Sequence, residues 1–156
     1  MKKIILLSAI SLGIYSSCKK EVTEVQQVNQ AFSAVYTIQP GDWTTNNNGL
    51  SYTAELPVPE LDNSIYNGGG VLVYISFTGT GYYEALPEVF DGFTYGAIHS
   101  KGYVGIDISA LSGAAINAPT QTISAKVILI DAQSLSLHKD VNLTDLGAVQ
   151  KAFNVK

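Results

Sequence analysis

Strict alternation of apolar and polar residues marks two segments of the chain. Residues 50–56 alternate without a break, from Leu50 through Tyr52 and Ala54 to Leu56, and residues 103–109 repeat the pattern. A period of two places alternate side chains on one face of a strand. Both segments are therefore predicted to be half-buried strands.

Shorter apolar and β-branched runs predict five further strands, at residues 33–38, 71–77, 82–86, 93–99 and 121–130. Residues 46–49 and 68–70 consist of Asn and Gly, and residues 100–102 end in Gly102; Asn and Gly tolerate the positive φ of tight turns. No alternation of strands with helices occurs between them. The pattern predicts an all-β fold: an antiparallel two-sheet β-sandwich of about seven or eight strands, Ig-like or jelly-roll-like.

Helical spacing appears only near the end of the chain. Leu146, Val149 and Phe153 recur at positions i, i+3 and i+7. Asn142 is a suitable N-cap and Asn154 a suitable C-terminal cap. One short helix is predicted at about residues 143–153.

The first residues have a different character. Two lysines precede the mainly apolar run 4–14, and Ser17 then precedes Cys18, the only cysteine of the chain. This layout is typical of a bacterial lipoprotein signal, in which the cysteine becomes the lipidated N-terminus. An ordinary secretory peptide is the alternative, but no Ala-x-Ala-like site is present. The run is too short for a membrane-spanning helix, which needs about 20 apolar residues.

This interpretation divides the chain into three parts. Residues 1–17 are a signal peptide, residues 18–30 are the lipidated Cys18 and a flexible tether, and residues 31–156 form the β-sandwich domain with its C-terminal helix. Removal of the signal leaves 156 − 17, or 139, residues, which fits one domain.

The charge of the chain excludes one class of partner. Nine Lys+Arg oppose 13 Asp+Glu, a net charge of −4, and every basic residue is lysine. Nucleic-acid binding requires a basic surface and favours arginine. We therefore expect no nucleic-acid partner.

Residues that carry catalytic or metal chemistry are few. His99 and His138 are the only histidines, no G-x-S-x-G elbow occurs, and Asp62, Asp91 and Asp107 are each isolated. Tetrahedral metal sites need several His or Cys ligands. The sequence predicts no catalytic residue, no metal, no cofactor and no enzymatic activity.

Aromatic residues are the better lead to a ligand. The chain holds nine Tyr, five Phe and one Trp. Trp43, Tyr82 and Tyr83 fall near turns or on strands where alternate side chains face outward, and flat aromatic rings stack on sugars. They are the candidate ligand-binding residues. Core packing is the alternative, because Tyr is a favoured strand residue in any sheet.

Several pieces in order resemble the small uncharacterised outer-membrane lipoproteins of the Bacteroidetes. They are Trp43, then PVPEL at 57–61, GVLVY at 70–74, YEALP at 83–87, AKVILI at 125–130 and the tail 143–155. The resemblance covers about residues 33–156. It implies a β-sandwich exported to the outer membrane, and it brings no known activity or functional residues.

The expected function is that of a cell-envelope lipoprotein, a non-catalytic binding or structural module that faces the periplasm or the cell surface. Its partners would be the membrane, through the lipid anchor, and a glycan or another envelope protein. The alternative is a carbohydrate-binding module that uses exposed Trp and Tyr side chains.

Overall fold

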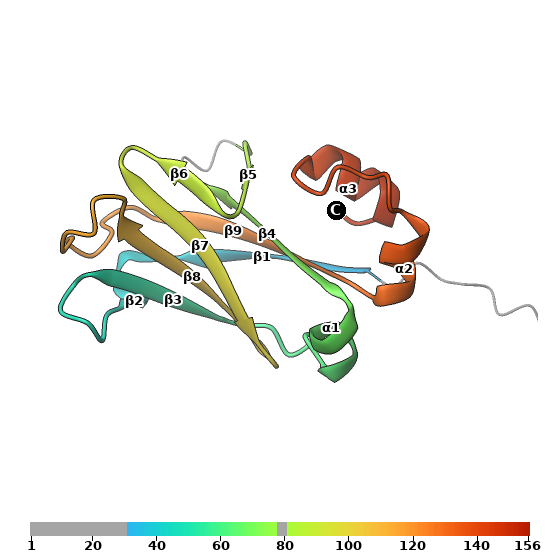
Figure 1. Cartoon of the computed structure of the whole chain (residues 1–156), viewed down its shortest axis with the longest axis horizontal. Coiled ribbons are helices and arrows are strands. Elements are labelled where there is room, and N and C mark those ends of the chain that lie inside the picture. Colours follow the sequence, from blue (N-terminus) through green and yellow to red (C-terminus); the bar gives the residue numbers. More distant parts are fainter. Residues whose placement is uncertain (1–30, 78–80) are drawn as a thin grey trace, which may run out of the picture.

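Two antiparallel sheets pack face to face in the structure, a computed structural model that describes residues 31–77 and 81–156 (Figure 1). The predicted β-sandwich is confirmed. The described residues form nine strands, where the sequence predicts seven or eight. The additional strands are Trp43–Thr44 and Glu88–Phe90, which are too short to show a periodic pattern in the sequence.

The first sheet has the order β1-β9-β4-β5. Its strands are β1 (Ala31–Ile38), β9 (Ile123–Ile130), β4 (Gly70–Ser76) and β5 (Glu84–Ala85). The second sheet has the order β2-β3-β8-β7-β6. Its strands are β2 (Trp43–Thr44), β3 (Ser51–Pro57), β8 (Tyr103–Ala110), β7 (Phe93–Ser100) and β6 (Glu88–Phe90).

Alternating residues of the two inner faces make the core between the sheets. Ile106 of β8 and Ala54 of β3 lie directly opposite each other, and both are fully buried. On β9, Ala125 and Val127 face them from the other sheet within the same cluster. Leu50 departs from its predicted place: it precedes β3 and is 49% exposed. The apolar face of this segment therefore begins at Tyr52.

A second apolar cluster covers part of the outer face of the first sheet. Ile128 and Ile130 of β9 meet Val149 and Phe153 of helix α3 (Leu146–Phe153), and all four are buried. Strand β9 is thus enclosed on both faces, which explains its nearly continuous apolar sequence.

Helix α3 confirms the predicted C-terminal helix, but its start is corrected. The side chain of Asp145 caps it by accepting from the backbone N of Ala148 at 3.0 Å. Asn142 instead accepts from the backbone N of Thr144 at 3.1 Å, within the preceding turn. At the other end, Asn154 adopts the left-handed conformation and closes the helix as predicted.

Two further helices are short. Helix α1 (Asn63–Gly68) starts after Asp62, whose side chain accepts hydrogen bonds from two backbone N–H groups. Helix α2 (Ala132–Leu137) starts after Asp131, whose side chain accepts a hydrogen bond from the backbone N–H of Ser134. Each has six residues, too few for an apolar stripe to be visible in the sequence. A 3-10 turn, η1 (Pro40–Asp42), precedes β2.

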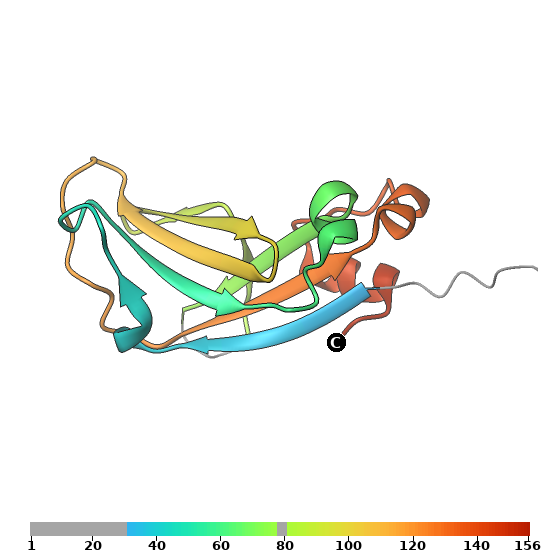
Figure 2. The same cartoon turned by 90° about the horizontal axis from the view of Figure 1, so that it is seen from below.

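The three α-helices gather at one end of the sandwich, and the loop 111–122 lies at the other (Figures 1 and 2). The described chain also begins at the helical end, with Ala31 paired to Ile130. There the hydroxyl of Ser33 donates to the carbonyl of Lys156 at 2.8 Å. The opposite end is called the loop end below.

Tyr74 of β4 fastens the segment that leads into α3. Its side chain is 1% exposed, and its hydroxyl donates to the carbonyl of Leu143 at 2.6 Å. Burial, and to a lesser degree the charge of Asp145, raise the pKa of Tyr74 from 10.0 to about 12.

The raised pKa of Tyr74 predicts a loss of stability at high pH. Above pH 10 the unfolded chain releases this phenol proton, whereas the folded protein holds it until about pH 12. Two pH units correspond to about 2.7 kcal/mol. Tyr74→Phe has no phenol to titrate, so it does not lose this stability at high pH. It does lose a hydrogen bond worth about 1 kcal/mol at every pH. At pH 8 the variant should have the lower free energy of unfolding. As the pH rises to 12, the wild type should lose stability and the difference between the two proteins should shrink.

Urea denaturation at a series of pH values measures this difference. Tyr82→Phe is the matched control, because Tyr82 is 80% exposed and makes no such contact. A gap between wild type and Tyr74→Phe that stays constant from pH 8 to pH 12 would contradict the prediction.

Candidate functional site

Trp43 does not face outward, which corrects the expectation for this candidate residue. It opens β2, pairs with the inward-facing Ala54 and is only 6% exposed. Directly paired residues on neighbouring strands share one face, so this pairing sends the indole into the core. Its ring N–H has no hydrogen-bond partner among the described residues.

Tyr82 and Tyr83 lie elsewhere and differ from each other. Tyr82 is 80% exposed, whereas Tyr83 is half-buried against the outer cluster of the first sheet. The ammonium of Lys126 lies 5.7 Å from the ring centroid of Tyr83. Trp43 belongs to the core on the opposite face of that sheet. The structure therefore does not join the three candidates into one aromatic platform.

The two histidines are also apart and are held by structural contacts. His99, exposed near the end of β7, meets the edge of the Tyr66 ring at 5.9 Å between centroids. The Nδ1 atom of His138 lies 2.9 Å from the carbonyl oxygen of Ser134, and its ring packs on Phe153. The groove that His99 helps to line contains no carboxylate in its lining.

Two of the three isolated aspartates have clear local partners. Asp62 caps α1, and Asp107 accepts from the hydroxyl of Thr53 across the strand pair. Within residues 31–77 and 81–156, no group of three His, Cys, Asp or Glu residues is placed to hold a metal ion. Asp91 is different, because it borders a cleft.

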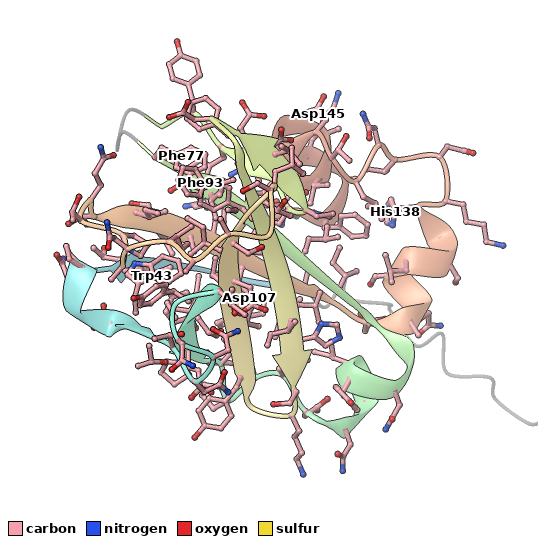
Figure 3. The ribbon with its side chains drawn as sticks, turned by 60° about the vertical axis from the view of Figure 1, so that its left-hand side comes forward. Trp43, Phe77, Phe93, Asp107, His138 and Asp145 are labelled. Atoms are coloured by element: carbon pink, nitrogen blue, oxygen red, sulfur yellow. The ribbon has the colours of Figure 1, made fainter. Side chains whose placement is uncertain are left out.

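This cleft opens at the loop end of the sandwich and has a volume of about 760 Å³. It is called the end cleft here. Phe77, Phe90, Phe93 and Tyr95 supply its aromatic wall, and the rest of the lining includes Ile108, Ile123 and the loop residues 115–121. In Figure 3, Phe77 and Phe93 lie at this end, away from His138 on the helical side.

The aromatic wall is assembled from strands of both sheets. Phe77 follows β4 of the first sheet, whereas Phe90, Phe93 and Tyr95 come from β6 and β7 of the second. The Phe77 ring stacks on Phe90 at 5.1 Å and meets Tyr95 edge-on at 4.8 Å. Phe90 remains 56% exposed, so one side of the wall stays open to a ligand.

A tight turn sets the polar rim of the end cleft. Asp91 and Gly92 both have positive φ, 51° and 79°, which lets β6 and β7 join within two residues and places the carboxylate beside the aromatic wall. Burial, then the charge of Asp91, raise the pKa of Tyr95. Its hydroxyl therefore stays protonated at neutral pH and can donate a hydrogen bond. Asn117 and Gln121 offer amide groups from the loop.

This arrangement suits recognition of a ligand that has an apolar body and a polar edge. The cleft lining contains one carboxylate and no histidine, cysteine or lysine among the described residues.

The sequence pattern did not indicate the phenylalanines of this wall. Phe90 and Phe93 flank the Asp91-Gly92 pair, a dipeptide that favours a two-residue hairpin turn. That signal places these two aromatics near each other. The position of Phe77 against them depends on how the two sheets pack, which no local pattern records.

No protein-family model, curated protein or solved structure matches this chain. The resemblance to Bacteroidetes lipoproteins stays a prediction from the sequence. The signal peptide, Cys18 and the tether lie outside the described residues. Within the part of the chain that the structure describes, none of the helices has the length and apolar character needed to cross a bilayer.

The burial of Trp43 can be tested by fluorescence, because it is the only tryptophan. We expect blue-shifted emission and weak quenching by acrylamide in the folded protein, with both properties lost in urea. Similar quenching in the folded and unfolded protein would show that the indole faces solvent.

Proposed function

We propose that this protein is a non-catalytic binding module, anchored to the outer membrane through lipidated Cys18, with the end cleft as its ligand site. The observation that carries the proposal is the position of the cleft. It opens at the end of the sandwich opposite the start of β1, the point at which the proposed tether would join the domain.

Strand β1 gives the separation of the two ends. It runs from Ala31, paired to Ile130 at the helical end, to Ile38, paired to Ile123 beside the cleft. Eight residues at about 3.3 Å each span about 25 Å. A domain attached by its helical end would thus hold the end cleft away from the lipid and open toward a partner.

The lining favours a small ligand with a ring or hydrocarbon body. The aromatic side chains supply apolar surface, while the Tyr95 hydroxyl and the loop amides supply hydrogen bonds at the edge. A few polar groups beside an apolar wall are the usual composition of a small-molecule site. A glycan is the second candidate, because an open ring face next to amide side chains is the combination that binds sugars.

Anchoring predicts a defined chemical modification. Mass spectrometry of the protein from the membrane fraction should find a mature chain that begins at Cys18 and carries acyl groups. Several chains would hold it firmly, at about 0.8 kcal/mol per buried methylene. An unmodified Cys18 thiol, or a mature chain that starts elsewhere, would contradict the anchor.

Ligand binding at the end cleft predicts local changes in nuclear magnetic resonance spectra. The full protein in nanodiscs, with labelled isoleucine methyl groups, is titrated with indole and with phenyl glucoside. Signals of Ile108 and Ile123 should shift, because both residues line the cleft, whereas Ile98, 56% exposed and outside its lining, should not. Stronger binding of the glucoside would identify the glycan class.

Neighbouring residues of β6 provide the matched variants. Phe90→Ala should weaken binding about fivefold through the loss of one aromatic contact. Val89→Ala, at a similarly exposed residue outside the cleft lining, should leave it unchanged. Equal affinity in both variants, or no shift at Ile108 and Ile123, would refute the end cleft as the site. Glucoside binding lost in Tyr82→Ala instead would move the site to that tyrosine.

A further inference from the structure

The border strands of the two sheets differ greatly in length. Among the described residues, β5 and β2 have two residues each and β6 has three, whereas β1 has eight. A border strand exposes unpaired backbone N–H and C=O groups on which another chain can pair. The shortness of β2, β5 and β6 limits such pairing, and β1 lacks that protection.

Strand β1 also lacks the other features that protect a sheet edge. Its sequence AFSAVYTI contains no charged residue, no proline and no glycine. It pairs with β9 over all eight residues, with no bulge to twist it away. Natural edges usually carry at least one of these devices.

No described strand pairs with the outer side of β1; a described contact at its start is the bond from the Ser33 hydroxyl to the Lys156 carbonyl. Its neighbour on the inner side is β9, and no other described strand pairs with it. Backbone hydrogen bonds from described loops and turns do not reach residues 31–38 either. Figure 2 shows β1 along the border of its sheet, with the end of the chain beside the start of the strand.

A groove of about 370 Å³ runs beside this free edge. Tyr36 and Thr37 of β1 line it, together with Asp42, which precedes β2, and Glu55 and Leu56 of β3. The lining contains two carboxylates and no basic side chain. A strand added to β1 would lie about 4.8 Å beyond it, with alternate side chains directed toward this groove.

We propose that β1 binds an extended segment of another protein as an additional antiparallel strand, and that a Lys or Arg side chain of this segment pairs with Asp42 and Glu55. The backbone of β1 supplies the hydrogen bonds, and the carboxylates select the charge. A second copy of this chain fits less well, because its own β1 brings no basic residue to the groove. This site is separate from the end cleft and does not depend on it.

The test uses the full protein in nanodiscs and a synthetic octapeptide in which valine alternates with polar residues, two of them lysine. Binding is measured by fluorescence anisotropy, and amide hydrogen exchange locates it. We expect binding that weakens with added salt and slower exchange at every second residue of β1, whose N–H groups point away from β9. Replacement of the lysines by glutamate, or N-methylation of alternate peptide amides, should abolish binding.

Matched variants separate a local charge effect from net charge. Asp42→Asn with Glu55→Gln should weaken binding about tenfold, and asparagine keeps the oxygen that accepts from the Gln39 backbone N at 2.7 Å. Asp140→Asn with Glu84→Gln removes the same charge at two exposed residues that do not line the groove and should have no effect.

Four results would overturn the proposal. They are no binding at millimolar peptide, equal weakening in the two double variants, binding without protection of β1, and binding that disappears in Phe90→Ala, which would place the peptide in the end cleft. A concentration-dependent dimer with β1 amides protected in the absence of peptide would instead identify a second copy as the occupant.

Discussion

Strand β9 is buried on both faces, and the arrangement of the other elements follows from this burial. One face meets the second sheet through Ala125 and Val127, and the other meets α3 through Ile128 and Ile130. A strand with apolar residues on both sides needs two covering layers. The C-terminal helix is therefore a third layer over part of the sandwich. The hydrogen bond from the Tyr74 hydroxyl to the Leu143 carbonyl holds the segment that precedes this helix.

The two ends of the sandwich differ in the elements that cover them. The helices α1, α2 and α3 gather at one end, where Val149 and Phe153 are buried but Tyr66 and Leu137 stay exposed. At the loop end, aromatic side chains from both sheets converge, and the loop 115–121 leaves space beside them. Rigid strands that place variable loops are a common basis for recognition. The two proposed sites would use different groups for recognition: side-chain surface in the end cleft and backbone groups at the β1 edge.

Local patterns predicted those elements whose side chains alternate over a long run. Strands β3 and β8 follow from their period of two, and α3 from its apolar spacing. The two-residue β2 has no period, so the inward position of Trp43 depends on its pairing with Ala54. The end cleft was missed for a similar reason, since Phe77 meets Phe90 and Tyr95 only when the two sheets pack. Contacts between segments distant in sequence leave no trace in local periodicity.

The bond between Ser33 and the carbonyl of Lys156 has a practical meaning for anyone who labels this protein. It places both limits of the described chain at the same pole, about 25 Å from the end cleft by the length of β1. A fluorophore or epitope fused after Lys156 would sit beside the proposed bilayer attachment, where antibodies have poor access. The same label inserted in the loop 111–122 would report on the opposite pole, next to any captured molecule.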